Sequence, residues 1–192
     1  MMLCDDCVLP FFTGPTFMII RLSGKLGKKI HASPTEILPV DENPFVDWSA
    51  HLFTADRAQY ILVTNTTSLY SMVLFGKGMT DDCRFLDRVV SAMSEFIQDD
   101  GHAFLYKRLI MPSTGLVRFS KALNQSVIGS MNDLVFQAKT YLREGTISPY
   151  EVSFKLNQTP MSILQYANPK EAFRTMRLPS AVSSHTMASP TP

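Results

Sequence analysis

The stretch YILVTNTTSLYSMVLF, residues 60–75, decides the fold class of this chain. Its two ends, residues 60–64 and 68–75, are rich in β-branched, aromatic and aliphatic side chains, which favour strands. The polar segment 65–67 between them suits a short turn. The stretch therefore predicts an antiparallel β-hairpin.

Other segments extend this hairpin into a sheet. An apolar, β-branched run begins at Met18 and predicts the first strand of the fold. Residues 103–110 and 115–119 predict a second hairpin, joined through residues 111–114. Residues 150–156 alternate apolar and polar side chains, which is the pattern of a strand with one buried face.

Two amphipathic helices accompany these strands. The first repeats apolar residues at helical spacing over 85–97 and closes at Gly101, and the second does so over 127–142 and stops at Gly145. A shorter helix is expected around residues 44–53, which open with a proline. The order of elements lacks strict βαβ alternation. We therefore predict an α+β fold, with a mostly antiparallel sheet and the two main helices packed on one of its faces.

The length and composition fit one domain. The chain has 192 residues, of which 45% are hydrophobic and 18% charged, as in ordinary globular proteins. Residues 1–17 carry acidic side chains and a proline where an export signal needs a positive segment and an unbroken apolar run, so they do not predict an export signal. Because the first strand-like run begins only at Met18, we expect residues 1–17 to be an extension outside the fold. Residues 18–177 form the expected domain. Residues 178–192 are rich in Ser, Thr and Pro and are expected to form a flexible tail.

Charge and cysteine usage limit the functional classes. The formal net charge of +1 gives no global field for nucleic acid, and no apolar run reaches the roughly 20 residues that span a bilayer, so we expect no membrane partner. The three cysteines cannot all pair, which favours a reducing cytoplasm. Cys4 and Cys7 form a C-x-x-C without a second half, and the common nucleotide and hydrolase motifs are missing. We therefore expect no metal and no cofactor.

The stretch NQSVIGSMNDL, residues 124–134, is the first candidate site. It places Ser130, Asn132 and Asp133 in a predicted helix, although such residues favour caps and turns. Phe136 would lie on the solvent side of this helix unless a partner or ligand covered it. The alternative is that the polar residues cap or flank the helix and that Phe136 is a single exposed aromatic residue.

Several basic residues and one histidine form further candidates. His51 is a candidate acid or base because its ordinary pKa lies near neutrality, and Arg57 follows it closely. Arg108 and Arg118 would face each other in the second predicted hairpin, where an anion could lie between them. Ordinary structural roles compete with each of these readings. A basic cluster that could meet phosphates comprises Arg21, Lys25, Lys28, Lys29 and His31.

Five stretches of the chain resemble an uncharacterised bacterial domain-of-unknown-function family. They are MIIRLSGKLGKKI, WSAHLFTADRAQYILVTNTTSLYSMVLFG, RFSKALN, NQSVIGSMNDL and FKLNQTPMS. The resemblance covers about residues 18–176, most of a domain-sized chain. It implies a single bacterial cytoplasmic domain whose first strand starts at Met18. It implies no activity, cofactor or catalytic residue.

Two functions follow from the sequence. The first is a non-enzymatic binding or regulatory module that recognises a protein or nucleic-acid partner, because a well-formed core pattern is present without a catalytic motif. The alternative is an enzyme acting on a phosphate-containing substrate such as a nucleotide or nucleic acid. In that case His51 would be the acid or base, and Arg57 and Arg108 would clamp the anion.

Overall fold

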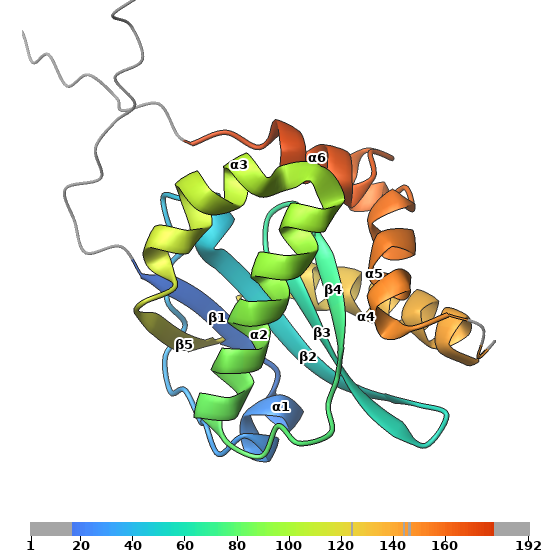
Figure 1. Ribbon diagram of the computed structural model, residues 1–192. Helices are drawn as coiled ribbons and strands as arrows, with labels where there is room; N and C mark the ends of the chain where they lie inside the picture. Colours follow the sequence, from blue (N-terminus) through green and yellow to red (C-terminus); the bar gives the residue numbers. More distant parts are fainter. Residues whose placement is uncertain (1–16, 124, 144, 146, 179–192) are drawn as a thin grey trace, which may run out of the picture.

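A five-stranded mixed sheet forms the centre of the fold in the computed structural model, which describes residues 17–123, 125–143, 145 and 147–178 (Figure 1). The strand order is β4-β3-β2-β1-β5, and β1 runs parallel to both of its neighbours, whereas β2, β3 and β4 pair antiparallel. The α+β class is confirmed, with a sheet that is mixed. The strands are β1 (Met18–Leu22), β2 (Asp47–Ala55), β3 (Ala58–Asn65), β4 (Ser71–Phe75) and β5 (Val117–Lys121).

The predicted hairpin over residues 60–75 is confirmed as β3 and β4, with Leu62 opposite Val73. The second predicted hairpin is wrong. Residues 103–110 are helical, and β5 pairs with β1 in parallel register instead. The segment 103–110 buries Tyr106 and Ile110, one helical turn apart, so its apolar residues satisfy a helix as well as a strand.

Helices cover both faces of the sheet. Strand β3 shows this directly, because Ile61 and Val63 pack in one core with α2 (Asp82–Ile97). Leu62 packs in a second core with α4 (Gln125–Arg143). Figure 1 shows α2 in front of the sheet and α4 behind it. The two helices were correctly predicted, but their placement on one face was wrong.

Residues 150–156 are not a strand. They lie in α5 (Pro149–Gln158), whose start is fixed by a capping box between Ser148 and Glu151 and by a proline in the first turn. The buried side chains Val152 and Leu156 are four residues apart, which fits a helix equally well. The capping signal therefore outweighs the alternation.

The short helix predicted over residues 44–53 is also wrong for most of its length. Only Pro44–Val46 form a 3₁₀ turn, after which β2 begins. Trp48 and Leu52 lie on the same face of β2, since residues two and four apart share a face of a strand. Their spacing was therefore compatible with either element.

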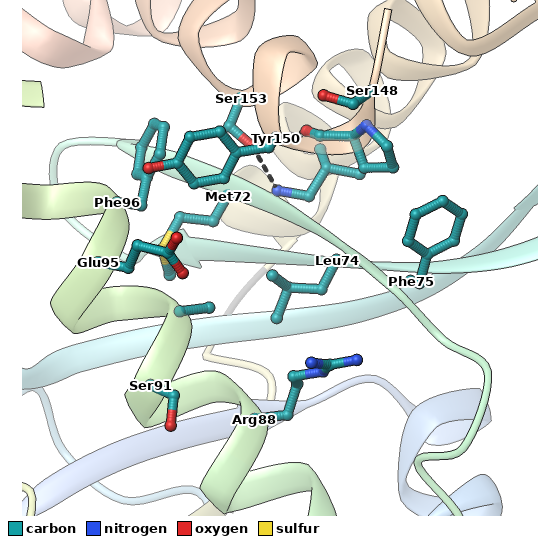
Figure 2. Close-up of a pocket in the computed structure, with 13 residues that line it drawn as sticks. Met72, Leu74, Phe75, Arg88, Ser91, Glu95, Phe96, Ser148, Tyr150 and Ser153 are labelled. Atoms are coloured by element: carbon teal, nitrogen blue, oxygen red, sulfur yellow. Dashed lines mark hydrogen bonds between the residues drawn. The ribbon is translucent and has the colours of Figure 1, made fainter. Parts of the chain in front are cut away.

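Helix α5 also closes part of the outer edge of β4. The Asn157 side chain accepts from the Ser71 amide (2.7 Å) and donates to the Ser71 carbonyl (2.9 Å). The Ser153 hydroxyl accepts from the Val73 amide at 2.9 Å, as Figure 2 shows. Two side chains of a helix thus replace a neighbouring strand, which satisfies edge groups that would otherwise attract another chain.

The remaining elements are short. They are the helical segments α1 (Gly24–Lys29), Gln98–His102, α3 (Ala103–Leu105), Tyr106–Ile110, Met111–Ser113, Ser162–Leu164 and α6 (Pro169–Thr175).

None of the helices in the described ranges is both long and apolar enough to cross a membrane. The predicted extension and tail fall almost entirely on residues 1–16 and 179–192, outside the described residues.

Candidate functional site

A cavity of about 550 Å³ lies at the carboxyl ends of β1 and β5. It forms because β1 ends at Leu22, opposite Ala50, while β2 continues past it to Ala55. Crevices at the carboxyl ends of parallel strands are the usual ligand sites of open α/β sheets. The cavity is lined by Leu22, Ser23, Gly24, Gly27, Lys28, Ala32, Ser33, Pro34, Ile37, Ala50, His51, Lys121, Ala122, Ile128 and Met131.

Ser23 lines the cavity between β1 and α1. It precedes the first residue of α1 but makes no side-chain capping bond. Its hydroxyl oxygen is buried without a hydrogen-bond partner in the described chain. Buried hydroxyls usually have a partner, so the Ser23 oxygen has an unmet hydrogen-bonding requirement beside the cavity.

Gly27 brings the end of α1 close to the chain that follows it. A Cβ at this position would lie 2.5 Å from the backbone oxygen of Ala32, which is too close for any other residue. The Ala32 amide donates to the Gly27 carbonyl at 3.0 Å. Both residues line the cavity, so this tight turn sets one of its walls.

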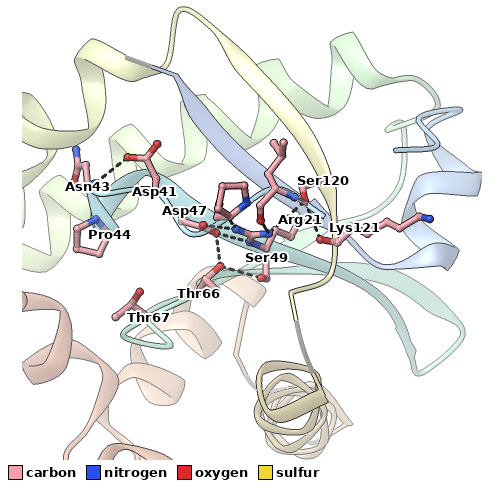
Figure 3. A network of polar contacts seen from close by, with 12 residues as sticks. Arg21, Asp41, Asn43, Pro44, Asp47, Ser49, Thr66, Thr67, Ser120 and Lys121 are labelled. Atoms are coloured by element: carbon pink, nitrogen blue, oxygen red, sulfur yellow. Dashed lines mark hydrogen bonds and ion pairs between the residues drawn. The ribbon is translucent and has the colours of Figure 1, made fainter. Parts of the chain in front are cut away.

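Residues 36–39, of which Ile37 lines the cavity, are held by the buried side chains of Arg21 on β1 and Ser120 on β5, which Figure 3 shows. Arg21 donates to the Leu38 and Pro39 carbonyls at 2.8 and 3.1 Å. The Ser120 hydroxyl accepts from the Leu38 amide at 2.9 Å. This segment is therefore fixed to β1 and to the edge strand β5.

Arg21 is itself held by a buried ion pair with Asp47. Two bonds of 2.8 and 2.6 Å join its guanidinium to the carboxylate, and both side chains are fully buried. Thr66 donates to the same carboxylate at 2.8 Å and bonds with Ser49 at 3.0 Å. We call Arg21, Asp47, Ser49, Thr66 and Ser120 the buried network. It connects β1, β2 and β5 to the cavity wall.

The cavity is cationic. Lys28 and Lys121 line it, and none of its lining residues is acidic. Burial, followed by the charges of Lys25 and Lys139, lowers the pKa of His51 below its ordinary value of 6.5. His51 is therefore neutral near pH 7 and surrounded by positive charge. The remaining lining is largely aliphatic, so the cavity suits a small ligand with an apolar body and an anionic group.

Of the predicted catalytic and clamping residues His51, Arg57 and Arg108, only His51 lines this cavity. Arg57 lies in the exposed turn after β2. Ala55, which precedes that turn, is four residues from His51, or about 13 Å along a strand. Arg108 lies exposed on the helical segment before β5, and exposed Arg118 rests over the Phe17 ring at 5.2 Å. The arrangement proposed for the enzyme is therefore not formed.

The candidate residues of α4 divide between its two sides. Ser130 is buried, and its hydroxyl donates to the Ser126 carbonyl at 3.1 Å within the helix. Asn132 and Asp133 are exposed, and Phe136 is 73% exposed. None of these four lines the cavity, although their neighbours Ile128 and Met131 do.

Sequence reasoning found part of the cavity and missed the rest. The basic cluster included Lys25 and Lys28, which lie at or near the cavity, but also Arg21, which is buried in an ion pair. Ser23 and Lys121 were missed. Ser23 follows β1 and Lys121 ends β5, and these two strands are far apart in sequence. Only their parallel pairing brings the two residues together.

The start of α2 carries a cluster of carboxylate and thiol groups, which are the types of ligand that metal ions bind. Asp81, Asp82 and Cys83 offer ligand atoms within 4.8 Å of one another. Asp81 accepts from the Arg84 amide and Asp82 from the Cys83 amide, so both carboxylates serve the start of α2. This use as a helix cap explains the cluster without an ion.

These features define a small α+β domain that has a ligand-sized cavity at the ends of its parallel strands. The model of a domain-of-unknown-function family, DUF6933, matches residues 19–172. The chain therefore belongs to this family, as the resemblance implied. No curated protein matches the chain.

Proposed function

We propose that this protein is a non-enzymatic binding module whose cavity at the ends of β1 and β5 takes a small organic anion. The observation that supports this most is the combination of two lysines with an aliphatic lining that contains no carboxylate. Such a site attracts negative charge and shields an apolar body from water. The odd number of cysteines and the family resemblance favour a bacterial cytoplasm as its location.

The ligand chemistry follows from the two kinds of side chain that line the cavity, basic and apolar. Lys28 and Lys121 would contact a carboxylate or phosphate. Ile128 and Met131 of α4 would cover the apolar part of the ligand. A ligand that binds β1, β5 and α4 together favours one arrangement of these elements, which is how a module reports a ligand to a protein or nucleic-acid partner.

A thermal-shift panel of small aromatic and aliphatic carboxylates and phosphates tests this function. A ligand that binds only the folded state raises the melting temperature in proportion to its affinity and concentration. We expect at least one class to stabilise the natural protein and to lose this effect in the double variant Lys28→Ala, Lys121→Ala. Neutral counterparts of the same compounds should have no effect. Equal shifts in both proteins, or none, would contradict the proposal.

The enzymatic alternative retains one specific support. His51 lies in the cavity with a lowered pKa, so its neutral imidazole could accept a proton from a bound phosphate-containing substrate. The variant His51→Asn separates the two functions. A binding module would keep its affinity with no turnover in either protein, whereas an enzyme would keep binding and lose its turnover.

A further inference from the structure

His51 is the residue of the cavity at β1 and β5 whose ordinary pKa lies closest to neutrality. It lies on β2 opposite Leu62 and lines the cavity together with Lys28 and Lys121. Its side chain is half-buried, and no hydrogen bond joins either ring nitrogen to another residue that the structure describes. Neither nitrogen is fully buried. A proton taken up by the ring would therefore face the contents of the cavity.

The charges around this ring are positive. Burial is the first cause of the lowered pKa of His51, and the charges of Lys25 on α1 and Lys139 on α4 follow. No carboxylate of the described chain is among the groups that act on it. Lys28 and Lys121 are the charged groups that share its cavity. While no ligand is bound, the ring stays neutral near pH 7, because a proton there would add one more cation to these lysines.

An anion in the cavity reverses this balance. Its negative charge offsets the lysines and attracts a proton to the His51 ring, and an opposite charge within about 4–6 Å favours the charged form of a group by about tenfold or more. Binding and protonation are linked, so a proton that is taken up on binding makes the binding tighter at lower pH. A histidine meets both states of the cavity, because it is neutral without the anion and charged beside it.

We propose that the cavity takes up an organic anion together with a proton at His51, so that its affinity for the anion rises as the pH falls. This inference rests on the function proposed above and adds the regulation of the same site. At a pH above the titration midpoints of both the free and the bound protein, the ring is neutral in both. As the pH falls through the bound midpoint, only the complex is protonated, and the gain in affinity is complete below the free midpoint.

1-Naphthoate serves as the probe, because carboxyl groups titrate near pH 4 and the compound therefore stays ionised above about pH 5. NMR titrations of the full chain at about pH 8 and about pH 5, on either side of the ordinary pKa of histidine, measure its affinity. We expect an affinity about three- to tenfold higher at the lower pH, and a rise of the His51 ring midpoint by about one pH unit in the saturated protein. The neutral 1-naphthamide should leave this midpoint unchanged.

Matched histidine variants identify the group that takes up the proton. The ratio of the affinities at the two pH values should fall to about one in His51→Asn, which cannot be protonated, and should persist in His31→Asn. His31 does not line the cavity and lies near Asp81, and asparagine tolerates its positive φ of 57°.

The outcomes separate this inference from the function on which it rests. Saturable binding with the same ratio in the natural protein and in His51→Asn would overturn the inference and leave the proposed function intact. The absence of saturable binding at either pH would contradict the proposed function and this inference with it.

Discussion

Arg21 lies in β1, and the two cavity lysines lie near the carboxyl end of that strand, Lys28 in α1 and Lys121 at the end of β5, but their situations are opposite. Arg21 is fully buried, and its guanidinium is paired with Asp47 and donates to the Leu38 and Pro39 carbonyls. Lys28 and Lys121 border a cavity that has no carboxylate among its lining residues. A cation that is already paired with its own chain maintains the fold, whereas cations grouped without a counter-charge are available to a ligand.

The two regions are also mechanically connected. Arg21 and Ser120 hold the wall formed by residues 36–39, and the lysines border the space beside that wall. The buried network therefore fixes the shape of the cavity, although none of its five side chains lines the cavity. Substitutions in the network should reduce stability first and binding as a result, whereas substitutions of the lysines should reduce binding alone.

Removal of Asp47 should have the largest effect. Asp47→Ala leaves the Arg21 charge buried without its partner, which should cost about 3–5 kcal/mol of unfolding free energy in urea denaturation. Lys121→Ala, the matched control, should change it by less than about 0.5 kcal/mol. Replacing both partners, as Arg21→Met with Asp47→Leu, should recover much of the loss. A double variant as unstable as Asp47→Ala would contradict the assignment of the loss to an unpaired charge.

The edge of the sheet offers an intermediate test of the same contrast. Asn157→Ala leaves the Ser71 amide and carbonyl buried without a partner, so we expect a loss of about 1–3 kcal/mol in denaturant titrations. Asn132→Ala, on the exposed face of α4, should cost less than about 0.5 kcal/mol. Similar values for the two variants would show that the helix does not seal the strand edge.

Glycine positions sharpen the comparison further. A Cβ at Gly129 meets nothing within 4 Å, so Gly129→Ala should stabilise the protein by about 0.5–1 kcal/mol through helix propensity. Gly27→Ala should destabilise it, because its Cβ would clash with the Ala32 carbonyl. Thermal unfolding of the two variants checks both signs. A destabilising Gly129→Ala would indicate a close contact that the present geometry lacks.

The smallest expected effect concerns the pH response of His51. Because its folded pKa is lower than its unfolded value of 6.5, its contribution to stability is complete above pH 6.5 and is lost as the pH falls through the folded pKa. An NMR titration of the ring should give a midpoint below 6.5, and Lys25→Ala should raise it. A midpoint above 6.5 would mean that a negative charge, not the lysines, dominates the site.

Local signals predicted the parts of this fold that depend on neighbours in sequence. Residues 60–75 form the expected hairpin, and α4 follows its apolar stripe. Residues 150–156 failed because their alternation and their i, i+4 spacing coincide, and the decisive signal was the capping box that begins at Ser148. The pairing of β1 with β5 joins segments about 100 residues apart, and single-sequence periodicity carries no information about it.

The site follows the same division. His51 was recognisable as a lone histidine and Lys28 as a member of a basic cluster. Their place in a site depends on Lys121 and Met131, which only the folded chain brings to the same cavity. Arg21 shows the converse. It was predicted as part of the basic cluster, but in the fold it is paired with Asp47, which lies in a segment that was expected to be helical. Charge in a sequence therefore indicates candidates, and pairing in the fold decides which of them are free for a ligand.

A titration of the isotope-labelled protein with 1-naphthyl phosphate, followed by NMR, tests the central claim most directly. The compound combines an apolar body with an anion, and 1-naphthol is its neutral control. The account predicts saturable shifts at Ser23, His51, Lys121 and Met131, absent with 1-naphthol and abolished by Lys28→Ala with Lys121→Ala. Shifts confined to other surfaces, or equal shifts with 1-naphthol, would contradict the claim that this cavity binds organic anions.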